Sequence, residues 1–231
     1  MNYHNQGQYA VMAEGFMTKV YGWMCVGLAI SAGVAYYIMS NVMLLQKIVS
    51  NFWLMAGLSI VSFGLILMMS FAFAKMSYAA VVASFLSFTV LQGITLTPVL
   101  LQYTQTSVAT VFLISSLMFL GMALYGTFTK ADLSSMGNIL LMGLWGLIVC
   151  GLVNIFFQNS LFQTMISACG VGIFAMLIAY DVQMLRRLSQ QVMMTPQDAG
   201  KFAVIGALNL YLNMINLFLY LLQLFGDKEK K

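Results

Sequence analysis

The sequence has very little charge for its length. Of its 231 residues, only 10 are Lys or Arg and 6 are Asp or Glu, which is 7% charged residues, whereas a globular domain carries about 25%. Hydrophobic residues make up 61% of the chain, and the mean hydropathy is +0.92. A chain of 25.5 kDa cannot hide that much apolar surface in its own core, because a soluble fold needs a polar surface. These numbers exclude a water-soluble fold and imply that apolar surface faces lipid.

Groups that bind metals, nucleic acids or substrates are also scarce. The surplus of +4 charges forms no Lys/Arg cluster that could follow a nucleic-acid backbone, which excludes nucleic-acid binding. The three cysteines lie in apolar runs without a metal-ligand spacing, and the single histidine, His4, lies near the N-terminus. The sequence has no HExxH motif and no pair of acids inside apolar segments. We therefore expect no enzymatic activity and no cofactor.

The apolar runs predict seven membrane crossings. The longest run, 52–103, would measure about 78 Å as one helix, against a hydrocarbon core of about 30 Å, so it must fold back near Lys75. The predicted crossings are 20–39, 52–74, 77–103, 108–128, 138–157, 161–185 and 202–225, the sixth being stopped by Arg186 and Arg187. The expected fold is an all-α integral membrane protein, a seven-transmembrane-helix bundle at 20–226, with an N-terminal tail at 1–19 and a charged C-terminal tail at 227–231.

The basic residues predict the orientation in the membrane. Positive charge in short loops favours the cytoplasmic side. An N-terminus in the cytoplasm places six basic residues inside and one loop lysine, Lys47, outside; the six are Lys19, Lys75, Lys130, Arg186, Arg187 and Lys201. We therefore expect the N-terminus to be cytoplasmic and the C-terminus to be outside.

Asp181 is the main candidate for chemistry, because it is the only carboxylate inside a predicted crossing. An acid at mid-bilayer costs about 2.5 to 3.5 kcal/mol, so it usually faces the interior of the bundle and marks an ion or proton path. Its position near the end of the crossing leaves open an interfacial ion pair with a basic neighbour such as Arg186. Lys75 ends the second crossing on the same side and is a candidate latch for Asp181; alternatively, it extends to the headgroups.

The last crossing carries a polar stripe. Its members are spaced 3, 4, 3, 4 and 3 residues apart, which places them on one helical face: Gly206, Asn209, Asn213, Asn216, Tyr220 and Gln223. Amide side chains in membranes hydrogen-bond neighbouring helices, and they also line hydrated paths; both interpretations stay open. Either one places the last helix at the centre of the bundle, as a pore lining or a helix seam.

Four strings resemble the bacterial branch of the Bax-inhibitor-1-like (transmembrane Bax inhibitor motif) family. They are QGITLTP at 92–98, YGTFTKADLS at 125–134, AYD at 179–181 and ALNLYLNMINLF at 207–218. The resemblance implies a bundle in the cell inner membrane with its last helix central, and a pH-modulated calcium leak gated by two aspartates near the cytoplasmic side. Asp181 matches the first of them, and Asn213 stands where the family usually has the second.

The number of carboxylates independently limits how tightly this chain can bind calcium. A tight site takes six to eight oxygen ligands, usually with several carboxylates. Asp181 offers a single carboxylate, so we expect weak and transient calcium binding. The rival interpretation is a non-conducting regulator that binds a membrane partner. The resemblance implies that this partner is a membrane-bound quality-control protease, bound through residues 1–19.

Overall fold

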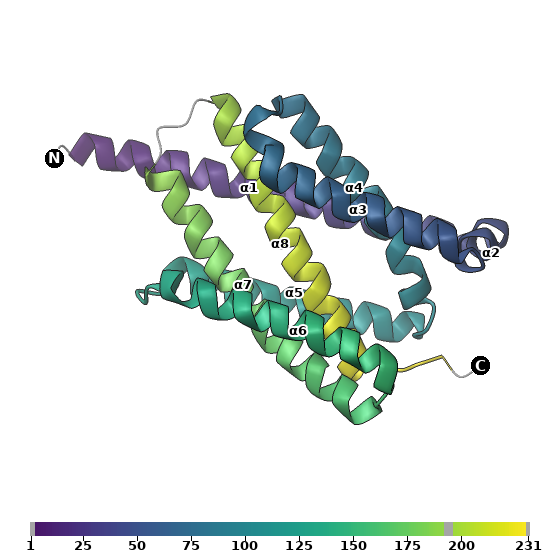
Figure 1. Ribbon diagram of the computed structural model, residues 1–231. Coiled ribbons are helices and arrows are strands. Elements are labelled where there is room, and N and C mark those ends of the chain that lie inside the picture. The colour runs from purple at the N-terminus through teal and green to yellow at the C-terminus, as the bar shows by residue number, and fades with distance from the viewer. Residues whose placement is uncertain (1–2, 192–195, 230–231) are drawn as a thin grey trace. The chain divides into compact units, whose positions relative to one another are not determined.

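The computed structural model describes residues 3–191 and 196–229, and this part of the chain is helical almost throughout (Figure 1). The helices are α1 Tyr3–Ser40, α2 Val42–Val49, α3 Phe52–Ala72, α4 Tyr78–Leu100, α5 Gln105–Phe128, α6 Gly137–Phe157, α7 Ser160–Gln191 and α8 Pro196–Phe225, with short 3-10 turns η1 Phe73–Lys75 and η2 Leu133–Met136. Over the described residues, the only β pairing is an isolated bridge between Tyr103 and Lys228. The all-α prediction is confirmed.

Within the described residues, seven helical segments are long and apolar enough to cross a membrane, as predicted. They are Gly15–Ser40, Phe52–Lys75, Tyr78–Leu100, Gln105–Phe128, Leu133–Phe157, Ser160–Gln190 and Asp198–Phe225. Lipid offers no hydrogen-bond partners, so each segment satisfies its own backbone as a helix. The last segment is the most buried, with 67% of its apolar window inside, against 33% or less for the others. This agrees with the predicted central position of the last helix.

Polar side chains fix where the crossings begin. The side chains of Asn51, Ser77 and Thr104 cap α3, α4 and α5, and each accepts a hydrogen bond from the backbone N–H three residues later. Such caps satisfy donors that the first helical turn leaves unpaired. The fold-back predicted near Lys75 therefore falls between η1 and the Ser77 cap.

The chain forms two compact units. Unit 1 comprises Met1–Gln102 and Ser189–Tyr211, and unit 2 comprises Tyr103–Leu188 and Leu212–Lys231. The first half of α8 thus belongs to unit 1 and the second half to unit 2.

In unit 1, α4 packs against α1 and α3. Gly93 lies at the α1 contact, where a Cβ would come within 2.7 Å of the carbonyl oxygen of Ser31. α4 continues through Gly93, and the missing side chain lets two helices approach closely. Beside this contact, the Ser31 hydroxyl lies within hydrogen-bonding distance of two groups. They are the Thr89 carbonyl oxygen, at 2.7 Å, and the Tyr211 hydroxyl, at 2.6 Å. All three residues are buried.

Candidate functional site

Asp181 and Asn213, the two residues that the sequence singles out, meet in unit 2. The Asn213 side-chain Nδ2 donates a hydrogen bond to Asp181 Oδ2 at 2.7 Å. Asn213 is buried, with 8% of its surface exposed, and Asp181 is partly exposed. A neutral amide that donates to a carboxylate makes a charge-assisted hydrogen bond without adding a second titrating group. The contact therefore joins α7 to α8 and holds one negative charge inside an apolar span.

Close backbone contacts position the helix that carries Asp181. A Cβ on Gly126 of α5 would overlap the carbonyl oxygen of Ala179, two residues before the acid. A Cβ on Gly137, where α6 begins, would come within 2.8 Å of the Tyr180 hydroxyl. The strings at 125–134 and 179–181, which are distant in the sequence, are therefore neighbours in unit 2.

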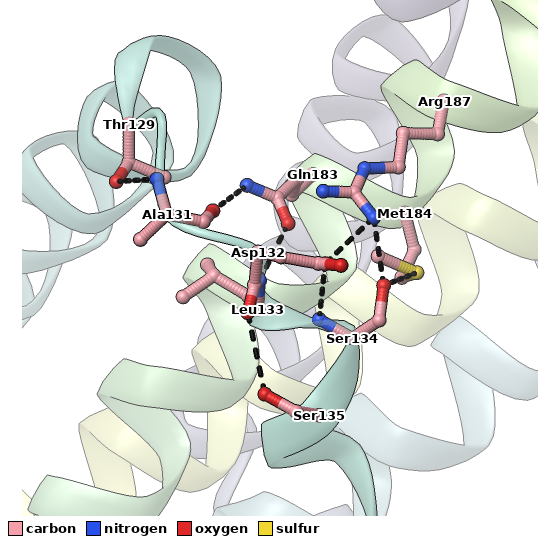
Figure 2. A network of polar contacts seen from close by, with 9 residues as sticks. All are labelled: Thr129, Ala131, Asp132, Leu133, Ser134, Ser135, Gln183, Met184 and Arg187. Carbon is pink, nitrogen blue, oxygen red and sulfur yellow. Dashed lines mark hydrogen bonds and ion pairs between the residues drawn. The ribbon is translucent and has the colours of Figure 1, made fainter.

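A buried amide fastens the loop between α5 and α6 to α7. Gln183 Oε1 accepts a hydrogen bond from the Leu133 backbone N–H at 2.9 Å, and Gln183 Nε2 donates to the Ala131 carbonyl oxygen at 2.9 Å (Figure 2). Gln183 is only 6% exposed. Sequence reasoning missed this residue, although an amide two positions after Asp181 in an apolar helix is a signal for a buried partner. Gln183 therefore holds the loop against α7, two residues after the acid in the sequence.

Two arginines of α7 extend the same contact. Arg187 donates to Asp132 Oδ1 at 2.7 Å and to the Ser134 hydroxyl at 2.7 Å (Figure 2), and Arg186 donates to the Thr127 carbonyl oxygen at 2.8 Å. The predicted end of this crossing at 185 is wrong, because α7 continues to Gln191. The arginines do not stop the helix, since their side chains reach partners on the loop and on α5.

Asp132 is exposed, but its carboxylate is strongly stabilised. Hydrogen bonds from the Ser134 backbone and side chain, followed by that from Arg187, lower the pKa of Asp132 to about 2. The folded loop therefore stabilises the ionised form of the Asp132 side chain relative to the protonated form.

The other predicted residues differ in their surroundings. Gly206 is buried, Asn216 is partly buried and donates to the Leu212 carbonyl oxygen at 2.8 Å, and Asn209 is exposed. Lys75 is exposed at the end of η1. Its role as a latch for Asp181 stays a prediction. Among the residues that the structure describes, no three His, Cys, Asp or Glu side chains gather where they could hold a metal ion.

In the part of the chain that the structure describes, seven helices apolar enough to cross a membrane, and an acid–amide contact between the last two of them, define a polytopic integral membrane protein. Comparison with known proteins narrows this class. The family model described as "Inhibitor of apoptosis-promoting Bax1" matches residues 13–230. The chain therefore belongs to the Bax-inhibitor-1-like family.

Individual relatives cover nearly the whole chain. The inner membrane protein YbhL of Escherichia coli strain K12 is 36% identical over 217 residues, which is 94% of this chain and 93% of YbhL. An uncharacterized protein of Borreliella burgdorferi is 40% identical over 222 residues, 96% of each chain. An uncharacterized protein of Deinococcus radiodurans is 37% identical over 214 residues, 93% of this chain and 91% of that protein.

Proposed function

We propose that this chain is a pH-modulated cation leak of the cell inner membrane that carries Ca²⁺, with the contact between Asp181 and Asn213 as its gate. The observation that supports this most is the 2.7 Å hydrogen bond from Asn213 to a carboxylate inside an apolar span. Such a charge is costly to keep in a membrane, and intramembrane acids commonly mark ion paths. The inner-membrane location follows the name of YbhL, and the N-terminus is placed in the cytoplasm by the positive-inside rule.

The chemistry of the contact suits a weak gate. A cation that reaches Asp181 competes with Asn213 Nδ2 for the carboxylate, so binding the ion releases α7 from α8. The freed amide of Asn213 can turn its oxygen toward the ion. One carboxylate and one amide fall far short of the six to eight oxygens of a tight calcium site. The ion therefore stays briefly, which a leak requires.

The pH response follows from the single acid. Protonation of Asp181 removes the charge that attracts the cation, so flux falls as the pH falls. Asn213 stays neutral at every pH, and the response has one titrating member. A second carboxylate at 213 would share a proton with Asp181, because two carboxylates so close cannot both ionise.

Calcium flux through purified protein in liposomes, measured with an entrapped calcium dye over a pH series, tests the proposal. We expect wild-type flux to fall with falling pH, Asp181→Asn to give low flux without pH dependence, and Asn213→Asp to steepen the response. Asp227→Asn is the matched control, because Asp227 is an exposed acid outside the spans; it should behave as wild type. Equal flux from all four proteins would refute the gate.

Flux no higher than in empty liposomes for every variant would favour the rival function, a non-conducting regulator. That protein would bind a membrane-bound protease or another membrane partner through residues 1–19. Crosslinking from these residues in intact membranes would then yield one stoichiometric partner, and deleting the tail would abolish it.

A further inference from the structure

The short helix α2 connects the first two spanning segments (Figure 1). The first of these segments ends at Ser40, and the second begins at Phe52. The Asn41 and Asn51 side chains cap α2 and α3 by accepting a hydrogen bond from a backbone N–H. One residue separates α2 from α1 and two separate it from α3, and a chain spans at most about 3.6 Å per residue. α2 therefore cannot move away from the membrane surface at which these two segments end.

α2 has an apolar side and a polar side. Its only polar side chains are Gln46 and Lys47. An α-helix turns by about 100° per residue, so Val42 and Val49 point in nearly the same direction, and Lys47 points about 140–160° away from both. Val42 and Val49 are exposed, although α2 packs against α1 and α3. The packing within unit 1 therefore leaves an apolar edge of α2 uncovered.

The exposed apolar surface continues onto the helices on either side of α2. Tyr36 and Tyr37, near the end of α1, and Phe52 and Trp53, at the start of α3, are between 64% and 82% exposed. Tyr and Trp are enriched where a membrane meets water, because the ring is apolar and its O–H or N–H is polar. These four side chains belong to helices that face lipid. The uncovered edge of α2 is thus continuous with a lipid-facing surface.

Lys47 provides a charge that a lipid phosphate can pair with. It is exposed, and no Asp or Glu occurs in the sequence between Glu14 and Asp132. In the predicted orientation it is the one loop lysine on the outer side, against the positive-inside rule. A phosphate partner accounts for this exception, because a lysine stem can lie along apolar surface while its ammonium group reaches the headgroups.

We propose that α2 is a phospholipid-binding helix that lies in the headgroup region. Its Val42–Val49 edge is inserted among the upper acyl chains, and Lys47 pairs with lipid phosphate. Amphipathic helices of this kind bury their apolar side about 5–10 Å into the boundary between headgroups and acyl chains. Because α2 is joined so closely to α1 and α3, it fixes the depth at which both helices cross. This inference goes beyond the proposed leak and does not depend on it.

Spin labels on single cysteines test where α2 lies. The three native cysteines of the full chain are replaced by Ala, and a nitroxide is attached to Val42→Cys, Val49→Cys or Lys47→Cys. All three positions are exposed, so a label there does not disturb a packed core. The purified protein is placed in vesicles of phosphatidylethanolamine and phosphatidylglycerol. Collisions of each label are then measured with oxygen, which concentrates among acyl chains, and with a water-soluble nickel chelate. We expect the ratio of oxygen to nickel collisions to be about fivefold higher at 42 and 49 than at 47.

Reversing a charge tests the contact with phosphate. Lys47→Glu places a negative charge against the phosphates, so it should lower the collision ratio of the label at 42 by about threefold. Lys130→Glu is the matched control, because Lys130 is an exposed lysine of another loop; it should leave that ratio unchanged. Gel filtration of each variant in detergent confirms that it is folded.

Three results would overturn this inference. Equal and frequent nickel collisions at 42, 47 and 49 would show that α2 lies in water. Few collisions with either reagent at 42 and 49, together with magnetic broadening between labels, would show that a second copy of the chain covers the edge. An unchanged ratio in Lys47→Glu would show that Lys47 does not bind phosphate. None of these results bears on the calcium leak, which the flux assay tests separately.

Discussion

Gln183 should contribute to the stability of the protein through its two hydrogen bonds to the loop between α5 and α6. Gln183→Leu keeps a similar volume but removes both hydrogen bonds to the loop between α5 and α6. Leu133 is 3% exposed, so its backbone N–H is left without a partner in a buried place, at a cost of about 1–3 kcal/mol. Ala131 is exposed, so water can replace the amide at its carbonyl oxygen, and the loss there is about 0.5–1.5 kcal/mol.

The sum is about 3 kcal/mol at the middle of these ranges. In a protein of this size, 1 kcal/mol lowers Tm by about 2–4 °C, so we expect Gln183→Leu to lower Tm by about 9 °C. Thermal unfolding in detergent, followed by intrinsic fluorescence at a fixed scan rate, measures the shift. Hydrogen exchange at the Leu133 amide should become faster in the same variant, because its bond to Gln183 is lost.

Gln190→Leu is the matched control. Gln190 lies on the same helix but is exposed, so its replacement should change Tm by no more than about 1 °C. Equal shifts in the two variants would refute the reasoning, because the effect would then come from adding an apolar residue to α7. Unchanged exchange at Leu133 would refute it separately.

Three further predictions concern stability. Folding lowers the pKa of Asp132 to about 2, so the ionised side chain stabilises the fold fully above the usual aspartate pKa near 4, and this stabilisation is lost as the pH falls toward 2. Asp132→Asn should therefore lower Tm at pH 6 more than at pH 3. Equal Tm shifts at the two pH values would contradict this. Gly126→Ala places a Cβ into the backbone of α7 and should cost about 1–3 kcal/mol in unfolding assays, whereas Gly121→Ala on the same helix meets no atom within 4 Å and should cost nothing. Ser31→Ala removes a partner of the fully buried Tyr211 hydroxyl and should cost about 1–3 kcal/mol; a smaller loss in urea titrations would show that Tyr211 finds another partner.

The number of crossings could be predicted because hydropathy depends on single residues and on length. A run such as 52–103 is too long for one crossing, and the one charged residue within it marks the turn. Where a helix ends depends also on the partners that its side chains find elsewhere in the fold. Arg186 and Arg187 were expected to end their crossing because they are charged, but Arg is a good helix former and both side chains found partners in the loop and on α5.

The contact between Asp181 and Asn213 was accessible from sequence, since the spacing of the polar stripe and the family resemblance both indicated Asn213. For Gln183, its position in an apolar helix indicates a buried partner, but the sequence does not identify that partner, because it consists of backbone groups of a loop 50 and 52 residues away. The hydrogen bonds that join Asn154, Gln163 and Gln223 were missed for the same reason. Nothing in the local pattern around Gln163 shows that Gln223, 60 residues later, accepts its hydrogen bond.

Asn154 makes a second hydrogen bond besides the one that its Nδ2 donates to Gln163 Oε1 at 2.6 Å. Its Oδ1 accepts from the Asn159 backbone N–H at 3.2 Å, in the turn where Gln158 adopts a left-handed conformation with φ 48°. Aspartate there would keep the turn and lose the donor to Gln163, while leucine would lose both. A single substitution at this position can therefore disturb the hairpin between α6 and α7 and the side-chain packing of α7 at the same time.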